Sequence, residues 1–209
     1  MAGYTLWQQT AVTGSAGAEL PYTLGTQFVV AVDCILTGIW WYSPAGAAAL
    51  PTVCGVWDIA NIAAIAEDGD PWWQSGGSNA LPGDGWVRDD FTAAGVVLAA
   101  GNPYAVAVWQ PASVAWYIAE SGYWDSGAGA DGLADGPLSA PDDADSVNGQ
   151  GCYDTTGIWT FPGTSPGDGE SFYADPEVIP VTGNVVPAAP PVMTGRVAVV
   201  AIQIGGGSR

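Results

Sequence analysis

Short apolar segments separated by turn residues repeat along most of this chain. Segments 28–32, 36–42 and 104–109 are rich in β-branched and aromatic residues, which favour pleated sheets. Within 36–42 alternate positions fall on opposite faces of a strand. Pro and Gly in 44–46 and 100–103 end such segments. The same features mark further strands at 52–57, 85–91, 96–98, 114–118, 158–161 and 171–174. This pattern, with almost no helical periodicity, predicts an all-β sandwich.

Residues 58–66 are the one segment where the pattern favours a helix. Asp58 is a candidate N-cap, and Ile59 and Ile62 then fall on one helical face. The alternative is a β-hairpin that turns at Asn61.

The remaining segments define the domain organisation. We divide the chain into an N-terminal arm or short first strand (1–20), the sandwich (21–181), a Pro-rich linker (182–195) and a C-terminal strand with a flexible tail (196–209). A Gly-, Asp- and Ser-rich loop over 121–151 lies within the sandwich region, and loops of this length usually contact partners or carry function.

The C-terminal strand is strongly apolar although it lies far from the other strands. Such a strand needs an edge to pair with, either in its own domain or in another subunit. We therefore predict a docking strand whose apolar side chains are Val197, Val199, Val200, Ile202 and Ile204.

The charge balance excludes several partners. The chain has 21 acidic residues, three basic residues (Arg88, Arg196 and Arg209) and no His, for a formal net charge of −18. Such a surface repels phosphate backbones and anionic membranes, so we expect no nucleic-acid or membrane partner. The N-terminus shows no secretory signal pattern, and no segment approaches the roughly 20 apolar residues of a membrane helix.

The composition also removes most catalytic designs. Without His or Lys, the chain has no Ser-His-Asp or Cys-His site, no lysine nucleophile and no imidazole for zinc. A carboxylate pair is the remaining route to catalysis, and we predict that the protein is not an enzyme. Cys34, Cys54 and Cys152 are expected to be buried free thiols, with a Cys34–Cys54 disulfide as the alternative.

Three aspartates of the long loop are candidate calcium ligands. Asp125, Asp131 and Asp135 supply hard oxygen ligands, but the spacing is not that of an EF-hand. The other interpretation is a solvated acidic loop with no cofactor.

Two aromatic pairs in or beside loops are candidate binding residues. Trp72, Trp73, Tyr123 and Trp124 could contact a protein partner or stack on a glycan if they are exposed. Alternatively, they cover the ends of the sandwich.

An ordered set of motifs resembles a known family. The set includes Leu36-Thr37-Gly38-Ile39-Trp40-Trp41-Tyr42, Gly85-Trp86-Val87-Arg88-Asp89-Asp90-Phe91 and Leu98-Ala99-Ala100-Gly101-Asn102-Pro103-Tyr104, and the match covers roughly residues 20–180. It resembles the domain of unknown function 4082, a bacterial and phage β-sandwich used as an accessory module. The resemblance implies a jelly-roll-like sandwich, no catalytic role and a hairpin at 58–66. The 121–135 loop and the C-terminal strand depart from it, and no binding residues transfer.

These expectations combine into one functional hypothesis. A surface-type sandwich without a signal segment fits a virion protein that assembles in the host cytoplasm. We expect an accessory structural protein of a phage from a high-GC host, on the tail or capsid. It would contact other virion proteins in a homo-oligomer or symmetric assembly. The alternative is a carbohydrate-binding module that recognises a cell-surface glycan.

Overall fold

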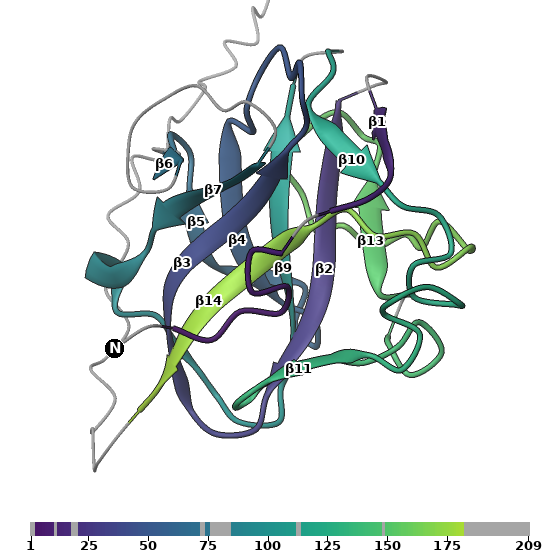
Figure 1. Ribbon diagram of the computed structural model, residues 1–209. Helices are drawn as coiled ribbons and strands as arrows, with labels where there is room; N and C mark the ends of the chain where they lie inside the picture. The colour runs from purple at the N-terminus through teal and green to yellow at the C-terminus, as the bar shows by residue number, and fades with distance from the viewer. Residues whose placement is uncertain are drawn as a thin grey trace, which may run out of the picture.

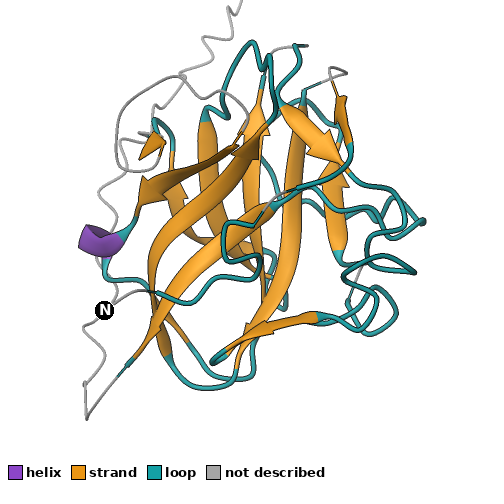
Figure 2. Cartoon of the chain, viewed as in Figure 1, coloured by secondary structure: helices purple, strands orange, loops and turns teal. Residues whose placement is uncertain are grey.

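The computed structural model describes residues 3–10, 12–17, 21–71, 74–75, 85–111, 114–147 and 149–181. Almost all regular structure in these residues is antiparallel sheet, and one 3-10 helix, η1 (Thr92–Ala94), accompanies it. The sheets pack on one another (Figures 1 and 2), so the predicted all-β sandwich is confirmed.

The larger sheet has seven strands in the order β11-β12-β2-β9-β4-β5, and β13 also pairs with β2. Its strands are β2 (Tyr22–Val30), β4 (Val53–Asp58), β5 (Ala63–Asp68), β9 (Pro103–Gln110), β11 (Leu133–Asp135), β12 (Leu138–Ala140) and β13 (Gly151–Asp154).

The second sheet has five strands in the order β14-β3-β7-β6, and β8 also pairs with β3. These are β3 (Cys34–Ser43), β6 (Gln74–Ser75), β7 (Gly85–Asp90), β8 (Val97–Leu98) and β14 (Ala174–Pro180). A separate two-stranded ribbon joins β1 (Ser15–Gly17) to β10 (Tyr117–Ala119).

The core fills the space between the two sheets. Phe28 from β2 and Ile39 and Trp41 from β3 are fully buried there. Trp41 stacks on Trp116 with ring centroids 5.4 Å apart. Burying one such side chain stabilises the fold by about 1.5–3 kcal/mol, so the alternating apolar positions account for the association of the sheets.

Residues 58–66 form a hairpin between β4 and β5, so the helix predicted from their pattern is wrong. The backbone N–H of Asn61 donates to Asp58 Oδ1 at 3.2 Å, and its side-chain amide donates to Asp58 Oδ2 at 2.8 Å. Asp58 thus closes a turn instead of capping a helix. Ile59 is buried while Ile62 is exposed, so the two do not share an apolar face. The resemblance implied this hairpin correctly.

The N-terminal segment covers part of the outer face of the smaller sheet. Tyr4 bridges to Val178 of β14, and Leu6 and Trp7 are buried. Figure 1 shows this purple segment crossing in front of β14. Residues 3–10 therefore belong to the folded unit.

Residues 155–165 lie against the outer face of the larger sheet. A Cβ added to Gly55 would lie 3.1 Å from the Trp159 ring, and one added to Gly25 would lie 3.1 Å from the Pro162 ring. Trp159 Nε1 donates to Glu67 of β5 at 2.6 Å. The two glycines therefore allow this segment to approach the sheet closely.

Candidate functional site

Tyr123 and Trp124 lie in the core. Their burial agrees with the alternative that they cover the sandwich and disfavours the binding role, which required exposed rings. Their exposed fractions are 6% and 1%, and Trp7 Nε1 donates to Tyr123 Oη at 2.9 Å. A Cβ added to Gly129 would lie 2.4 Å from the Tyr123 ring and 2.6 Å from the Trp124 ring. The glycines that follow the aromatic pair thus let the loop fold back over both rings. These glycines are visible in the sequence and could have indicated that the two rings are covered.

The three candidate calcium ligands do different things. The carboxylate of Asp135 accepts a hydrogen bond from the backbone N–H of Thr5 at 3.3 Å, and Asp125 and Asp131 are exposed. No group of three or more His, Cys, Asp or Glu within the described part of the chain is arranged to hold a metal ion. The structure therefore does not bring these aspartates together as a calcium site.

The other predicted binding residues lie outside the part of the chain that the structure describes. These are Trp72, Trp73 and the predicted docking strand at 196–204. Their roles stay predictions from the sequence.

Cys34, Cys54 and Cys152 are buried free thiols, as expected, and the alternative Cys34–Cys54 disulfide does not form. Burial raises the pKa of Cys152 to about 12, and burial together with the charge of Asp33 raises that of Cys34 to about 11. Cys54 Sγ contacts Asp89 Oδ2 at 3.5 Å, and burial followed by this carboxylate raises its pKa as well. All three therefore stay protonated at neutral pH.

We expect all three thiols to be unreactive towards a disulfide reagent such as DTNB in the native protein, because the thiolate is the nucleophile and is neither formed nor accessible. Absorbance of the coloured product at pH 7.5 should show that no protein thiol reacts before denaturant is added and that three react afterwards. A rapidly reacting thiol in the native state would contradict the buried placement.

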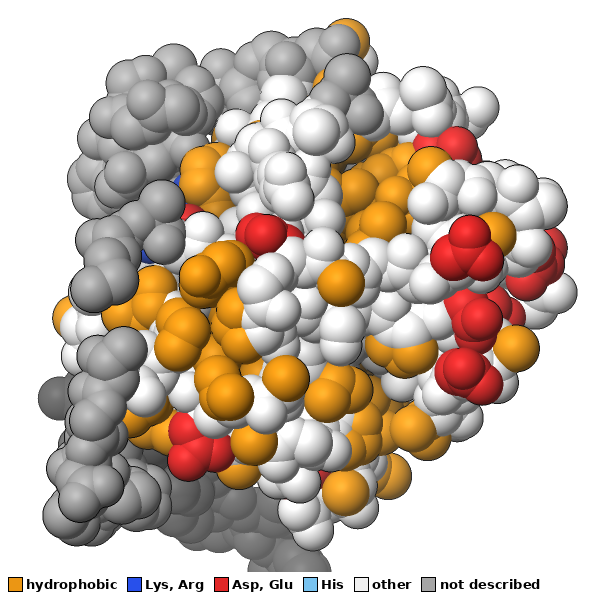
Figure 3. Space-filling model, turned by 60° about the horizontal axis from the view of Figure 1, so that its bottom comes forward, with side chains coloured by type: hydrophobic (Ala, Val, Ile, Leu, Met, Phe, Trp, Pro, Cys, Tyr) orange, Lys and Arg blue, Asp and Glu red, His pale blue; other side chains and the backbone are white. Residues whose placement is uncertain are grey.

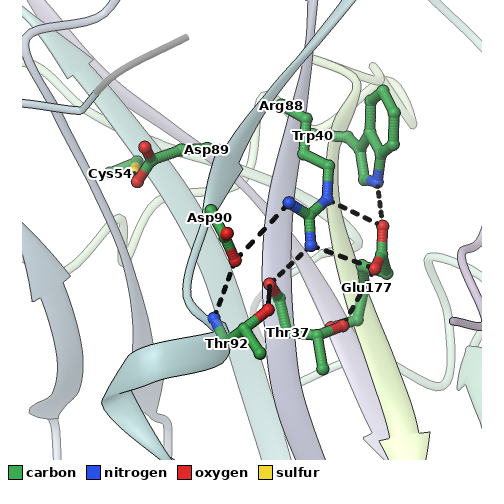
Figure 4. A network of polar contacts seen from close by, with 8 residues as sticks. All are labelled: Thr37, Trp40, Cys54, Arg88, Asp89, Asp90, Thr92 and Glu177. Carbon is green, nitrogen blue, oxygen red and sulfur yellow. Dashed lines mark hydrogen bonds and ion pairs between the residues drawn. The ribbon is translucent and has the colours of Figure 1, made fainter. Parts of the chain in front are cut away.

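One polar network crosses the outer face of the smaller sheet (Figure 4). Arg88 on β7 donates from Nε to Glu177 Oε2 at 3.0 Å and from Nη2 to Glu177 Oε1 at 3.1 Å. Nη2 also donates to the carbonyl oxygen of Thr37, and Trp40 Nε1 donates to Glu177 Oε2 at 2.8 Å. A Cβ on Gly38 would lie 2.6 Å from Arg88 Nε, so a side chain at this position would displace the guanidinium. The network joins β3, β7 and β14.

Arg88 is the only basic side chain among the described residues, and these contacts occupy it. Burial opposes charge on Glu177, but the hydrogen bonds from Arg88 and Trp40 outweigh it and hold its pKa below the usual value. Figure 3 shows hydrophobic side chains over much of one face and acidic side chains gathered at one side, with almost no blue. The described surface therefore offers no cluster of cations for a phosphate group.

A groove of about 490 Å³ among the described residues is a candidate for a ligand site. It is lined by the β1–β10 ribbon, which lies at the upper right of Figure 1, and by residues of β2 and β13. Sequence reasoning missed it, because its walls combine residues near the N-terminus with residues 117–119 and residues 153–172, about a hundred or more positions later.

Four aromatic rings line this groove. They are Tyr22 at the start of β2, Tyr117 of β10, Tyr153 of β13 and Phe172 just before β14. They form a closed cycle of edge-to-face contacts with centroid distances of 6.1–6.5 Å. Tyr117 and Phe172 are buried, whereas Tyr22 and Tyr153 are partly exposed. The cycle fixes each ring against two others and leaves two of them accessible.

Two carboxylates share the groove with these rings. Asp168 and Glu170 belong to a segment that is tied to its surroundings on both sides. Ser121 Oγ donates to Asp168 Oδ2 at 2.6 Å, and the backbone N–H of Trp124 donates to the carbonyl of Gly169 at 2.8 Å. The exposed, hydrogen-bonded Asp168 carboxylate is suited to accepting hydrogen bonds from a ligand.

Comparison with known proteins adds no relative. The sequence matches no family model and no curated protein. The resemblance to the domain of unknown function 4082 therefore stays a prediction. Across the residues that the structure describes, no helix is long and apolar enough to span a membrane.

Proposed function

We propose that this chain is a non-enzymatic accessory structural protein of a virion, which docks through its C-terminal segment and presents the sandwich. The phage context of the proposal derives from the resemblance noted in the sequence. The docking role derives from the relation between the sandwich and the segment that follows it.

The observation that carries the proposal is that the last described strand, β14, packs with β3 in a well-buried core. Leu36 and Trp41 on β3 and Ala174 and Val178 on β14 are fully buried, and β14 ends at Pro180. In the sequence, the apolar segment 196–204 follows this strand after a Pro-rich linker. An apolar strand after a linker needs a sheet edge to pair with, and in this proposal another subunit supplies that edge.

The charge of the chain supports the same role. A formal net charge of −18 keeps free subunits apart in solution, because like charges repel. Docking would then depend on a specific strand contact and not on general attraction.

Deletion of residues 187–209 is expected to leave a folded monomer that no longer joins the particle. We would add the tagged variant to lysates of infected host cells and measure its co-sedimentation with particles. Tryptophan fluorescence should show a thermal midpoint close to that of the full chain. Deletion of 205–209 alone is the matched control and should retain docking, since it leaves the apolar positions intact. Undiminished co-sedimentation of the longer deletion would overturn the docking role.

Carbohydrate recognition is the second candidate function. The aromatic and acidic groove favours it, because such a lining suits a polyhydroxylated ligand.

A further inference from the structure

We propose that the groove between the β1–β10 ribbon and strands β2 and β13 binds a short neutral oligosaccharide. This inference does not depend on the docking role of the C-terminal segment. It would hold for a chain that docks elsewhere or does not dock at all.

The apolar part of the lining suits the carbon–hydrogen faces of sugar rings. Tyr22 and Tyr153 are the partly exposed members of the aromatic cycle, and the buried Tyr117 and Phe172 support them. Aromatic side chains give large contact areas with little loss of rotamer freedom. Because their edge-to-face contacts already fix the rings, ordering them on binding costs little.

The polar part of the lining suits hydroxyl groups. Asp168 and Glu170 supply acceptors, and Ser15, Thr155 and the tyrosine hydroxyls can both donate and accept. A sugar hydroxyl likewise donates and accepts, so a lining with both capacities matches it.

The segment that carries the carboxylates is held in place before any ligand arrives. At one end Tyr153 and Thr164 exchange two backbone hydrogen bonds of 2.8 and 3.0 Å. At the other end Glu120 and Ser171 exchange two of 3.1 and 3.0 Å. A site that is built on such a framework keeps its geometry and favours specific binding.

Charge and size select among ligand classes. Two carboxylates in the groove and a net charge of −18 disfavour uronic or sialic acids. A single alkylammonium group would meet the rings and carboxylates, but it would leave most of a cavity of about 490 Å³ and all of its hydroxyl groups unused. A neutral chain of a few sugar rings would fill the groove and would also form hydrogen bonds with its hydroxyl groups.

The test uses the full chain and a defined set of probes. Isothermal titration would measure binding of neutral hexose, pentose and N-acetylhexosamine trisaccharides, with tetramethylammonium and a uronic acid trisaccharide as comparison ligands. At least one neutral trisaccharide should bind, with no binding of the uronic acid. Asp168→Asn should weaken binding of the neutral trisaccharide about tenfold, since an amide replaces a charged acceptor. Ala16 lies on the exposed strand β1 and lines the groove, so Ala16→Trp should fill the groove with a ring and abolish trisaccharide binding.

Matched controls change charge or size elsewhere. Asp145→Asn removes an exposed carboxylate outside the groove, and Ala134→Trp adds a ring on exposed β11; both should bind as the unchanged chain does. Binding of tetramethylammonium without any neutral sugar would overturn the proposal. So would the absence of any binding, or sugar binding that Ala16→Trp leaves intact. None of these outcomes affects co-sedimentation, so the docking role is tested separately.

Discussion

Replacing Glu177 with alanine is expected to lower the free energy of unfolding by about 3 kcal/mol, because it leaves a mostly buried guanidinium without its carboxylate. The Arg88 and Glu177 side chains are only 21% and 16% exposed, and two hydrogen bonds join them. Glu177 also accepts from Trp40, so the substitution removes a second partner in the same network. Urea unfolding followed by tryptophan fluorescence would measure the change.

The double variant Arg88→Met with Glu177→Leu separates two quantities. One is the cost of leaving a charge without a partner, and the other is the net contribution of the ion pair to the free energy of unfolding. Since both charges then leave the sheet together, we expect it to recover most of the stability lost in Glu177→Ala. Asp90→Asn is the control at the network's edge, where the side chain is 56% exposed and lies 3.6 Å from Arg88 Nη1. Its effect should be below about 1 kcal/mol. Equal effects of Asp90→Asn and Glu177→Ala would contradict a central role for Glu177.

Strands β3 and β9 were predictable because the cause of their pattern is local, but the strand predicted at 158–161 does not form. Strands β11 and β12 lie within the segment 121–151 that was predicted to be a loop. Alternation in residues 36–42 placed Ile39 and Trp41 on one face and Trp40 on the other, and the structure buries the first two fully while Trp40 stays partly exposed. Turn residues likewise marked where strands end. Period-two patterns report burial directly, since each strand has only two faces.

Local pattern fails where a contact joins distant segments. Tyr123 and Trp124 lie in a polar, glycine-rich stretch, yet Trp7, more than a hundred residues earlier, packs against both. The helix predicted at 58–66 failed for a related reason, since the pairing of β5 with β4 decides its conformation. Propensity within nine residues could not include that pairing.

The groove illustrates the same limit for function. No short motif links Tyr22, Tyr117, Tyr153 and Phe172, because the antiparallel pairing of β2 with β13 and the approach of β10 bring them together. Candidate residues chosen from aromatic pairs or aspartate runs therefore missed it. The sequence offered a binding module only as the alternative function, and the sheet topology shows which distant residues line the groove.

Raising the pH from about 4 to about 8 is expected to destabilise the protein through Asp175, which is fully buried on β14. Its carboxylate oxygens accept the backbone N–H groups of Leu6 at 2.8 Å and Trp7 at 3.1 Å. Burial raises the pKa of Asp175 to about 8, against the lowering effect of these two hydrogen bonds, and the charges of Glu177 and Asp135 raise it further. The folded chain therefore keeps a proton that the unfolded chain has lost.

The sign of the effect follows from proton binding. Below the unfolded pKa of 3.8 both states are protonated, and the contribution of Asp175 to stability is fully present. Above it only the folded state binds the proton, so the free energy of unfolding falls with each further rise in pH until the folded carboxyl ionises near 8. The gap between the two pKa values corresponds to roughly 6 kcal/mol.

Asp175→Asn isolates this contribution, because an amide resembles the protonated carboxyl at every pH. We expect the variant to match the unchanged chain near pH 3.5 and to be several kcal/mol more stable near pH 8.5, as measured by urea unfolding at each pH. Asp145→Asn, an exposed control with the same loss of charge, should follow the unchanged chain throughout. Hydrogen exchange at the amides of Leu6 and Trp7 should accelerate with pH beyond its intrinsic increase only where Asp175 is present.

Parallel pH profiles for the chain and Asp175→Asn would show that the carboxylate is ionised in the fold and that its two N–H donors outweigh its burial. Divergent profiles would mean that the N-terminal segment is held most tightly in acid, when the carboxyl that anchors it is neutral.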